Sequence, residues 1–290
     1  MAEVPQYIVT GILNGGIYAL IGLGIVLIYK ASSIFNFSIG AMICMSAYFL
    51  YAFLVQLGLP VGASIVLCII TSILLGMLLE RGALRPLIGQ PLLSSVLVTL
   101  ALSYLLTGIV TGAWGSYQYK MPEIFPGGAV FIGKVTLAHD LLWCFGIAVA
   151  LFAALAIFYQ RTHLGLSMRA TAESHIVAQA RGINVSRVLS FSWAFCGLIA
   201  GAAGLLLGYR VGVSQFVAGV AFKAFPVVLF GGLESIIGCL IGGLVVGVLE
   251  SLAGGLVASW LMEPTPYIIL LFVLIFRPEG LFGLKRIERI

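Results

Sequence analysis

Nine apolar stretches follow one another along this chain, and most are about as long as a membrane is thick. A helix needs ~20 apolar residues to cross the hydrocarbon core of a bilayer. The stretches that meet or approach this length are 6–29, 37–56, 59–79, 92–113, 140–159, 188–208, 217–233, 236–257 and 264–276. The last is short, and Lys223 and Pro226 interrupt the seventh. We therefore predict an all-α polytopic membrane protein, a single transmembrane domain over residues 1–290, with eight to ten transmembrane or re-entrant helices.

The composition excludes an ordinary soluble fold. Hydrophobic residues make up 61% of the 290, charged residues only 9%, and the mean hydropathy is +1.17. A soluble domain is about 45–50% apolar and about 25% charged, because its surface must stay polar. The first residues include Glu3 instead of a basic segment, so we expect no cleavable signal peptide.

The charged residues predict an orientation. The net charge is +5, but the basic residues form no long run and lie in short loops between apolar stretches, which is typical of membrane topology and not of nucleic-acid binding. If the spans alternate, one side holds Lys30, Arg81, Arg85, Arg161, Arg169, Arg181, Arg187, Arg277, Lys285, Arg286 and Arg289. The other holds Glu3, Glu123, Asp140, Glu250, Glu263, Lys120, Lys134 and Arg210. The basic side should be cytosolic, with the C-terminus cytoplasmic and the N-terminus periplasmic in a bacterial inner membrane.

Catalytic and cofactor motifs are missing from the sequence. The five cysteines are scattered singly in apolar segments, so we expect small buried hydrophobic residues. The three histidines form no metal motif, and no Ser/His or paired-Asp constellation lies within the spans. Segment 128–135 matches GxxxxGK but ends in Val135 where a P-loop needs Ser or Thr. We expect no cofactor and no enzymatic activity, and ATP would have to be bound by partner subunits.

Glycines recur at a spacing of four residues. Such pairs let membrane helices approach closely, and we interpret them as ordinary bundle packing. They are Gly11/Gly15, Gly108/Gly112, Gly197/Gly201, Gly204/Gly208, Gly238/Gly242 and Gly243/Gly247.

Two interrupted apolar segments indicate a weak internal inverted repeat. A small-residue helix, an interruption and a second helix occur at 11–56 and again at 197–257. The interruptions are FNFSIG at 35–40 and FKAFP at 222–226. Paired broken helices of this kind indicate a transport pathway.

Asn36 allows two interpretations. Its side chain can cap a helix that starts within Phe37–Gly40 at the membrane interface. Alternatively, Asn36, Ser38 and Gly40 belong to the translocation pathway, where the exposed N–H groups of a half-helix face a polar substrate.

Lys223 is also open to two interpretations. A charge inside a span faces a cavity or a partner, which would place Lys223 in the pathway, or its amine snorkels to the nearer surface. Glu234 and Glu250 flank the same apolar region. An ion-coupled secondary transporter that uses Glu234 or Glu250 as a proton site is therefore an alternative function.

Loop 160–187 is the best candidate for contact with a cytosolic protein. We predict one short helix over 167–181 that ends at Gly182. The helix is either a solvated loop helix or a docking element for an ATPase. The docking residues would be Ala170, Ala172, Glu173, Ala178, Arg181 and Gly182. The small alanines would fit a shallow groove on the partner, and Glu173 and Arg181 would pair with charges at its rim. The other long loop, 114–139, is predicted to be external.

Five segments resemble one transport family. They are NGGIYALIGLGIVLIY with IFNFSIGAMICMSAY, the loop RTHLGLSMRATAESHIVAQARGINVSRV, AFKAFPVVLFGGLESIIGCLIGGLVVGVLE and LIFRPEGLFG. Over nearly the whole chain these are similar to the permease subunits of branched-chain amino acid ABC importers, LivH type. Asn36 and Gly40 match the family's Asn-Phe-Ala-x-Gly element, 182–184 the end of its cytosolic loop, and 277–283 its C-terminal signature.

The resemblance implies a multi-subunit importer. This chain would pair with a second, related permease subunit as a heterodimer. Two cytosolic ATP-binding subunits and a periplasmic solute-binding protein would complete the complex, and membrane lipid would surround it. Where many members have Ala-His-Gly-Glu, this chain has Ser38-Ile39-Gly40-Ala41, and Ser46 replaces a glycine. The expected substrate is therefore a branched-chain or hydrophobic amino acid, or a related small polar or carboxylate solute.

Overall fold

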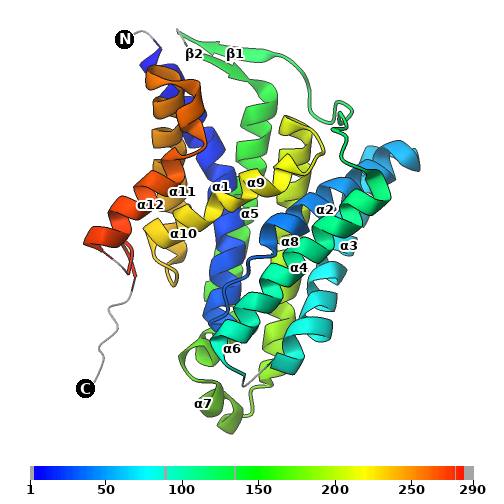
Figure 1. Ribbon diagram of the computed structural model, residues 1–290, viewed down its shortest axis with the longest axis vertical. Coiled ribbons are helices and arrows are strands. Elements are labelled where there is room, and N and C mark those ends of the chain that lie inside the picture. The colour runs from blue at the N-terminus through cyan, green and yellow to red at the C-terminus, as the bar shows by residue number, and fades with distance from the viewer. Residues whose placement is uncertain (1–2, 88–89, 134, 278, 284–290) are drawn as a thin grey trace. The chain divides into compact units, whose positions relative to one another are not determined.

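The structure is a computed structural model that describes residues 3–87, 90–133, 135–277 and 279–283. Within these ranges, seven helical segments are long and apolar enough to cross a membrane (Figure 1). They are α1 (Val4–Ser32), α2 (Ile39–Tyr51, continued by a π-helical turn to Gln56), α3 (Val61–Leu79, continued to Leu87), α4 (Leu92–Trp114), α5 (His139–Arg161), α8 (Val185–Val211) and α11 (Ile236–Leu252, continued to Val257).

Two shorter apolar helical segments bring the number to nine in the described residues. The segment Phe216–Gly231 consists of α9 (Phe216–Phe222) and α10 (Ala224–Gly231), and α12 spans Thr265–Phe276. All nine coincide with the nine apolar stretches of the sequence, which confirms the all-α polytopic fold with eight to ten membrane segments. The interruption expected in the seventh stretch is confirmed at Lys223, which separates α9 from α10.

The two long loops contain more regular structure than the sequence indicated. Loop 114–139 includes an antiparallel hairpin of β1 (Ala129–Ile132) and β2 (Val135–Ala138), with Ala129 opposite Ala138 (Figure 1). The P-loop-like segment lies in this hairpin, and its Lys134 is outside the described residues. Loop 160–187 contains two helices, α6 (His163–Glu173) and α7 (His175–Ala180).

The chain divides into two compact units. Unit 1 comprises residues 1–26, 125–152 and 223–290, and unit 2 comprises residues 27–124 and 153–222.

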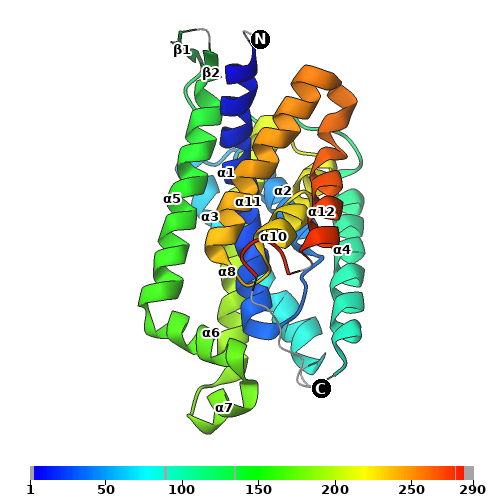
Figure 2. The same cartoon turned by 90° about the vertical axis from the view of Figure 1, so that its left-hand side faces the viewer.

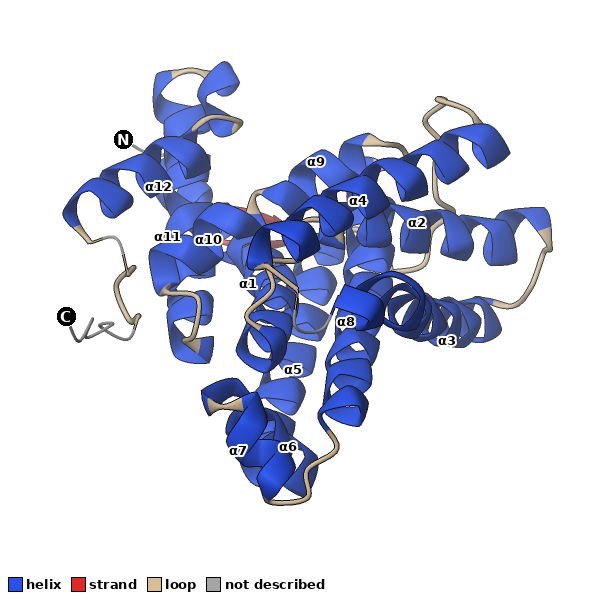
Figure 3. Cartoon of the chain, turned by 60° about the horizontal axis from the view of Figure 1, so that its bottom comes forward, coloured by secondary structure: helices blue, strands red, loops and turns tan. Residues whose placement is uncertain are grey.

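Glycines hold the helices of each unit at close distance. In unit 1, Gly11 and Gly15 of α1 meet the backbone of α11 at Gly247 and Gly243. In unit 2, α3 and α8 lie side by side (Figure 3), and Gly76 and Gly197 each meet the backbone of the other helix. A side chain at these glycines would collide with backbone atoms, so the packing interpretation is confirmed there. By contrast, a Cβ atom added at Gly108 or Gly112 would meet no atom of the described residues within 4 Å.

The C-terminal signature folds back onto α10. The Leu281 N–H donates to the Phe230 carbonyl at 2.9 Å, and the Phe282 N–H donates to the Gly231 carbonyl at 3.1 Å. Two of the last carbonyls of α10, which have no partner within the helix, are thereby satisfied. Pro278 and the basic residues Lys285, Arg286 and Arg289 are outside the described residues.

Candidate translocation and coupling sites

The first interrupted stretch forms a buried polar turn in unit 2. Helix α1 ends at Ser32, Ser33 adopts φ +55°, and α2 begins at Ile39 with Ser38 in the N-cap position. The Asn36 side-chain oxygen accepts hydrogen bonds from the Ser38 N–H at 3.0 Å and from the Ser38 hydroxyl at 2.6 Å. This bond to the residue two positions later forms an Asx turn. Helix α2 starts at Ile39, within the expected range, but its N-cap position is held by Ser38, so Asn36 is not the N-cap residue.

Two other helices hold this turn in place. The Thr99 hydroxyl of α4 accepts from the Phe37 N–H at 3.4 Å and lies 3.1 Å from the Phe35 carbonyl oxygen. The Asn36 amide nitrogen lies 3.5 Å from Cys196 Sγ of α8. Asn36, Ser38 and Thr99 are all fully buried. The structure thus brings Asn36 and Ser38 together with Thr99 and Cys196, two residues that the sequence analysis missed.

Gly40 lies where α2 approaches α9. A Cβ atom at this position would lie 3.0 Å from the Ala218 carbonyl oxygen and 3.3 Å from the Phe222 ring. Any larger residue would push α9 away from α2. Gly40 therefore sets the spacing between α2 and α9.

The second interruption contains a buried ion pair in unit 1. The Lys223 amine lies 2.7 Å from Glu250 Oε1 of α11 and 3.1 Å from Glu263 Oε1. The side chains of Lys223 and Glu250 are 5% and 6% exposed, whereas that of Glu263 is 77% exposed. The interpretation that the Lys223 amine snorkels to the membrane surface is therefore wrong, because the amine pairs with the buried carboxylate of Glu250. Glu250 is buried too, which corrects its predicted place among the charges at the membrane surface.

Glu250 has a further partner and an unused oxygen. The Tyr18 hydroxyl of α1 donates to Glu250 Oε1 at 3.3 Å, while Glu250 Oε2 is buried without a hydrogen-bond partner among the described residues. Tyr18 and Glu263 were not among the sequence candidates. Glu250 could be singled out because it is a charged residue in an apolar stretch. No local sequence signal connects it to Tyr18, which lies 232 positions earlier.

The predicted helix over 167–181 is two helices. It breaks at Ser174, which adopts an extended conformation and whose hydroxyl accepts from the Val177 N–H to cap α7. Helix α6 begins earlier than predicted, with Thr162 as its N-cap. The predicted end is confirmed, since Gly182 has φ +81°. Figure 2 shows α6 turning away from the end of α5, with α7 beyond it.

The predicted docking residues differ in exposure and fall into three groups. Glu173, Arg181 and Gly182 are exposed, and Ala170 and Ala172 are half-buried. Ala178 is buried among Ala31, Val185 and Leu189 of the same chain. A partner-facing role for Ala178 is therefore wrong. The exposed apolar side chains of α7 are Ile176, 80% exposed, and Val177, 59% exposed.

Several of the basic residues that were predicted to share one side of the membrane lie at one end of unit 2. The Lys30 amine and the Arg169 guanidinium lie 5.7 Å and 5.5 Å from the centre of the Tyr159 ring. Arg81, just after α3, and Arg187, near the start of α8, line one pocket. Arg210 lies at the other end of α8. The predicted grouping is confirmed for these residues, and the compartment that they face stays a prediction.

All five cysteines are buried free thiols, as expected. No cluster of histidine, cysteine or acidic residues suited to a metal ion occurs in the part of the chain that the structure describes. Broken helices with buried polar residues, in a glycine-packed bundle of membrane spans, define the class of helical membrane permeases.

The comparisons identify the family. The chain belongs to the branched-chain amino acid transport system / permease component family, whose model matches residues 7–277. It is 29% identical to the high-affinity branched-chain amino acid transport system permease protein LivH of Escherichia coli K12, over 98% of this chain and 97% of that protein. It is 28% identical to the corresponding permease BraD of Pseudomonas aeruginosa, over 100% of both.

A solved structure has the same fold. PsaBC from Streptococcus pneumoniae, determined in complex with Fab, matches with a TM-score of 0.50 and 14% identity, over 95% of this chain and 92% of that one. Membership of the family makes the chain a multi-pass permease component of a transport system, as the resemblance of its motifs predicted.

Proposed function

We propose that this chain is the permease subunit of an ATP-driven importer in a bacterial inner membrane. The complex would contain a second, related permease subunit, two cytosolic ATP-binding subunits and a periplasmic solute-binding protein. The substrate would be a branched-chain or hydrophobic amino acid, or a related small polar or carboxylate solute. Support comes from the family and from the names of LivH and BraD, which refer to branched-chain amino acid transport.

The observation that best supports this proposal is the exposed apolar surface of α7. Ile176 and Val177 are 80% and 59% exposed on a six-residue helix that is too short to span a membrane. Exposed apolar side chains beside the charges of Glu173 and Arg181 are typical of a protein interface, with an apolar centre and a polar rim. We expect α7 to be the element that contacts an ATP-binding subunit.

Helix α7 also packs against the end of α1 and the start of α8, which would move if a partner displaced α7. Ala178 packs between Ala31, near the end of α1, and Val185 and Leu189 at the start of α8. The His175 ring nitrogen lies 3.3 Å from the Ala31 carbonyl oxygen. The turn of Asn36 follows Ala31 within five residues. A displacement of α7 would thus reach the polar turn through direct packing.

The translocation pathway would include the polar groups at the two interruptions. These are Asn36, Ser38 and Gly40 in unit 2 and Lys223 in unit 1. In the described conformation Asn36 and Ser38 bond to one another and Lys223 bonds to Glu250, so neither set is open to solvent. Exposure of these groups during the transport cycle would supply polar contacts for the substrate.

The alternative of an ion-coupled transporter gains no support. Glu250, one of its two proposed proton sites, already binds the Lys223 amine, and the relatives are permeases of transport systems of the branched-chain amino acid type. A loss of uptake on adding an uncoupler, while cellular ATP is held constant, would revive this alternative.

The test is a charge placed on the exposed apolar surface of α7. Ile176→Glu should uncouple the ATPase from the solute-binding protein, because a buried Ile side chain contributes about 1.5–3 kcal/mol and a charge cannot replace it. We expect docking to weaken by at least about tenfold. The assay is binding-protein-stimulated ATPase and uptake in proteoliposomes, together with the level of the subunit in the membrane.

Gln179→Glu provides the matched control, since it adds the same charge to another exposed position of α7. It should leave coupling near the wild-type level. If Ile176→Glu retains full stimulated ATPase and uptake, α7 is not the coupling element.

A further inference from the structure

A basic pocket lies at one end of unit 2, between the end of α3 and the start of α8. It has a volume of about 450 Å³ and is lined by Met77, Arg81, Arg85, Asn184, Ser186, Arg187, Ser190 and Phe191. Three arginines thus converge on one cavity in a chain with only 9% charged residues. Such a concentration of charge at the end of a membrane span calls for a ligand or a counter-ion.

Only one of the three arginines is neutralised by the described residues. Arg85 binds Glu80 through two nitrogens, at 3.1 and 3.2 Å, and also donates to the Ser190 hydroxyl at 2.8 Å. The guanidinium groups of Arg81 and Arg187 have no hydrogen-bond or ion-pair partner among the residues that the structure describes, and both residues are exposed. Two positive charges therefore remain for an anion.

The start of α8 adds polar groups to the same place. Asn184 is the N-cap of α8 and accepts from the Arg187 N–H at 3.1 Å. The first turn of a helix carries free N–H groups and the positive end of the helix dipole. Together with the two arginines, this favours an anion with several acceptor oxygens, such as a phosphodiester.

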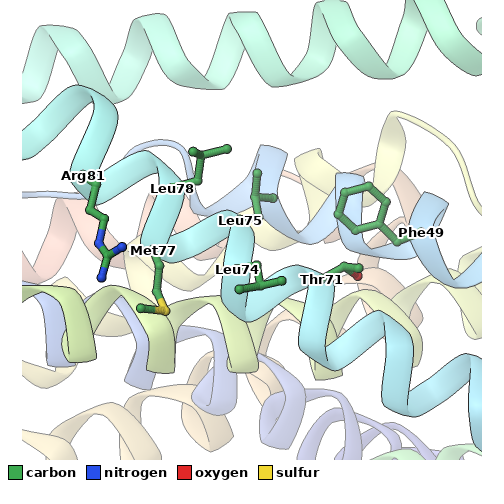
Figure 4. A pocket seen from close by; sticks show the side chains of 7 residues that line it. All are labelled: Phe49, Thr71, Leu74, Leu75, Met77, Leu78 and Arg81. Atoms are coloured by element: carbon green, nitrogen blue, oxygen red, sulfur yellow. The ribbon is translucent and has the colours of Figure 1, made fainter.

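An apolar groove continues from the pocket along α3. It also has a volume of about 450 Å³, and it shares Met77 and Arg81 with the basic pocket. Figure 4 shows its side chains, Thr71, Leu74, Leu75, Met77, Leu78 and Arg81 on successive turns of α3 with Phe49 from α2. Leu74 and Leu78 are 57% and 66% exposed on a helix that is long and apolar enough to cross a membrane.

From this geometry we propose that unit 2 binds an anionic glycerophospholipid. The phosphate group lies between Arg81, Arg187 and the start of α8, and one acyl chain lies in the groove past Leu78, Leu74 and Phe49. A soluble anion would use the basic pocket but leave the groove empty. A membrane lipid would fill both the basic pocket and the apolar groove. Its charged headgroup is joined to its acyl chains, and the headgroup lies at the membrane surface, where a span leaves the bilayer. The site needs only that α3 faces lipid, so it does not rest on the proposed transport function.

The experiment measures lipid retention by the purified full-length chain. The chain is exchanged into detergent with added dioleoyl phosphatidylglycerol or dioleoyl phosphatidylcholine, and bound lipid is counted by native mass spectrometry. We expect tight, saturable retention of one phosphatidylglycerol in preference to phosphatidylcholine. Each arginine near a membrane surface strengthens binding of an anionic lipid roughly fivefold, so Arg81→Gln with Arg187→Gln should weaken retention about thirtyfold.

Matched variants separate the charge from the groove. Arg161→Gln removes an exposed arginine outside both cavities and should leave retention unchanged. Leu74→Trp should fill the groove and lower retention, whereas Leu105→Trp, at a leucine that is likewise 57% exposed but lies outside the groove, should not. Thermal unfolding of each variant checks that it remains folded, and an unfolded Leu74→Trp is replaced by Leu78→Trp.

Three outcomes would overturn the proposal. One is equal retention of phosphatidylglycerol by the wild type and the double arginine variant. Another is displacement of the lipid by millimolar glycerol 3-phosphate with no effect of the groove variants, which would identify a soluble-anion site. The third is a cross-link from a cysteine at Leu74 to a neighbouring subunit in the assembled importer, which would show that protein occupies the groove.

Discussion

The ion pair of Lys223 and Glu250 gives the sharpest prediction about stability. Both side chains are about 95% buried, and their charged atoms are 2.7 Å apart. Removing one member of such a pair leaves an uncompensated charge in the interior, which typically costs about 3–5 kcal/mol. Replacing both members by uncharged side chains of similar size is often neutral. Lys223→Met and Glu250→Gln should therefore each destabilise strongly, whereas the double variant should be close to the wild type.

Glu263 provides an internal comparison for this prediction. Its oxygen is also within reach of Lys223, at 3.1 Å, but its side chain is 77% exposed. Solvent-exposed ion pairs contribute only about 0–1 kcal/mol. Glu263→Gln should therefore have a small effect, even though it removes a partner of the same lysine.

The assay is thermal unfolding of the purified chain in detergent, followed by tryptophan fluorescence. A loss of about 3–5 kcal/mol corresponds to a decrease in Tm on the order of 10 °C in a chain of this size. The coupling energy from the double-mutant cycle should be several kcal/mol. The reasoning would be refuted if the double variant lost as much stability as the two single variants together. Such additive losses would show that the two charges do not compensate one another.

The same variants address the pathway. If Lys223 serves only to hold α10 against α11, the stable double variant should transport normally. If it also contacts the substrate, as we propose, the double variant should fold and reach the membrane but lose uptake.

Two further predictions concern the polar turn and the orientation. Asn36→Leu should lower stability by about 1–3 kcal/mol, because two buried donors of Ser38 lose their acceptor; Ser38→Ala, which keeps the bond from the residue 38 N–H, should cost less in the same unfolding assay. An Asn36→Leu chain as stable as the wild type would contradict the Asx turn. Ala180→Cys, at an exposed position of α7, should react with an impermeant thiol reagent only after cells are permeabilised, whereas labelling in intact cells would reverse the predicted topology.

Much of the fold follows from hydropathy, which is a local property of the chain. Each of the nine apolar stretches became a helical segment, because in lipid the backbone must satisfy its own hydrogen bonds. The break at Lys223 and the positive φ at Gly182 are equally local, since a charge within an apolar helix and a glycine at a helix end act on their immediate neighbours.

The candidate sites were predictable only in part. The sequence pointed to Asn36, Lys223 and Glu250 as polar residues in apolar surroundings. It proposed Asn36 instead of Ser38 as the cap of α2 and missed the break at Ser174, because several caps were available within a few positions and side-chain bonding selects among them.

The sequence by itself determined that this chain spans a membrane repeatedly and that its apolar stretches are interrupted at 35–40 and 222–226. The tertiary structure decided which side chains meet. Lys223 and Tyr18 both bond to the carboxylate of Glu250, and the Asn36 amide contacts Cys196. Ala178 is buried, whereas Ile176 is exposed. The physical reason is that helix rotation about its own axis leaves the hydropathy of an apolar span almost unchanged. The face that meets a neighbour is therefore fixed by close packing between helices, as at Gly76 and Gly197, and not by the order of residues along one of them.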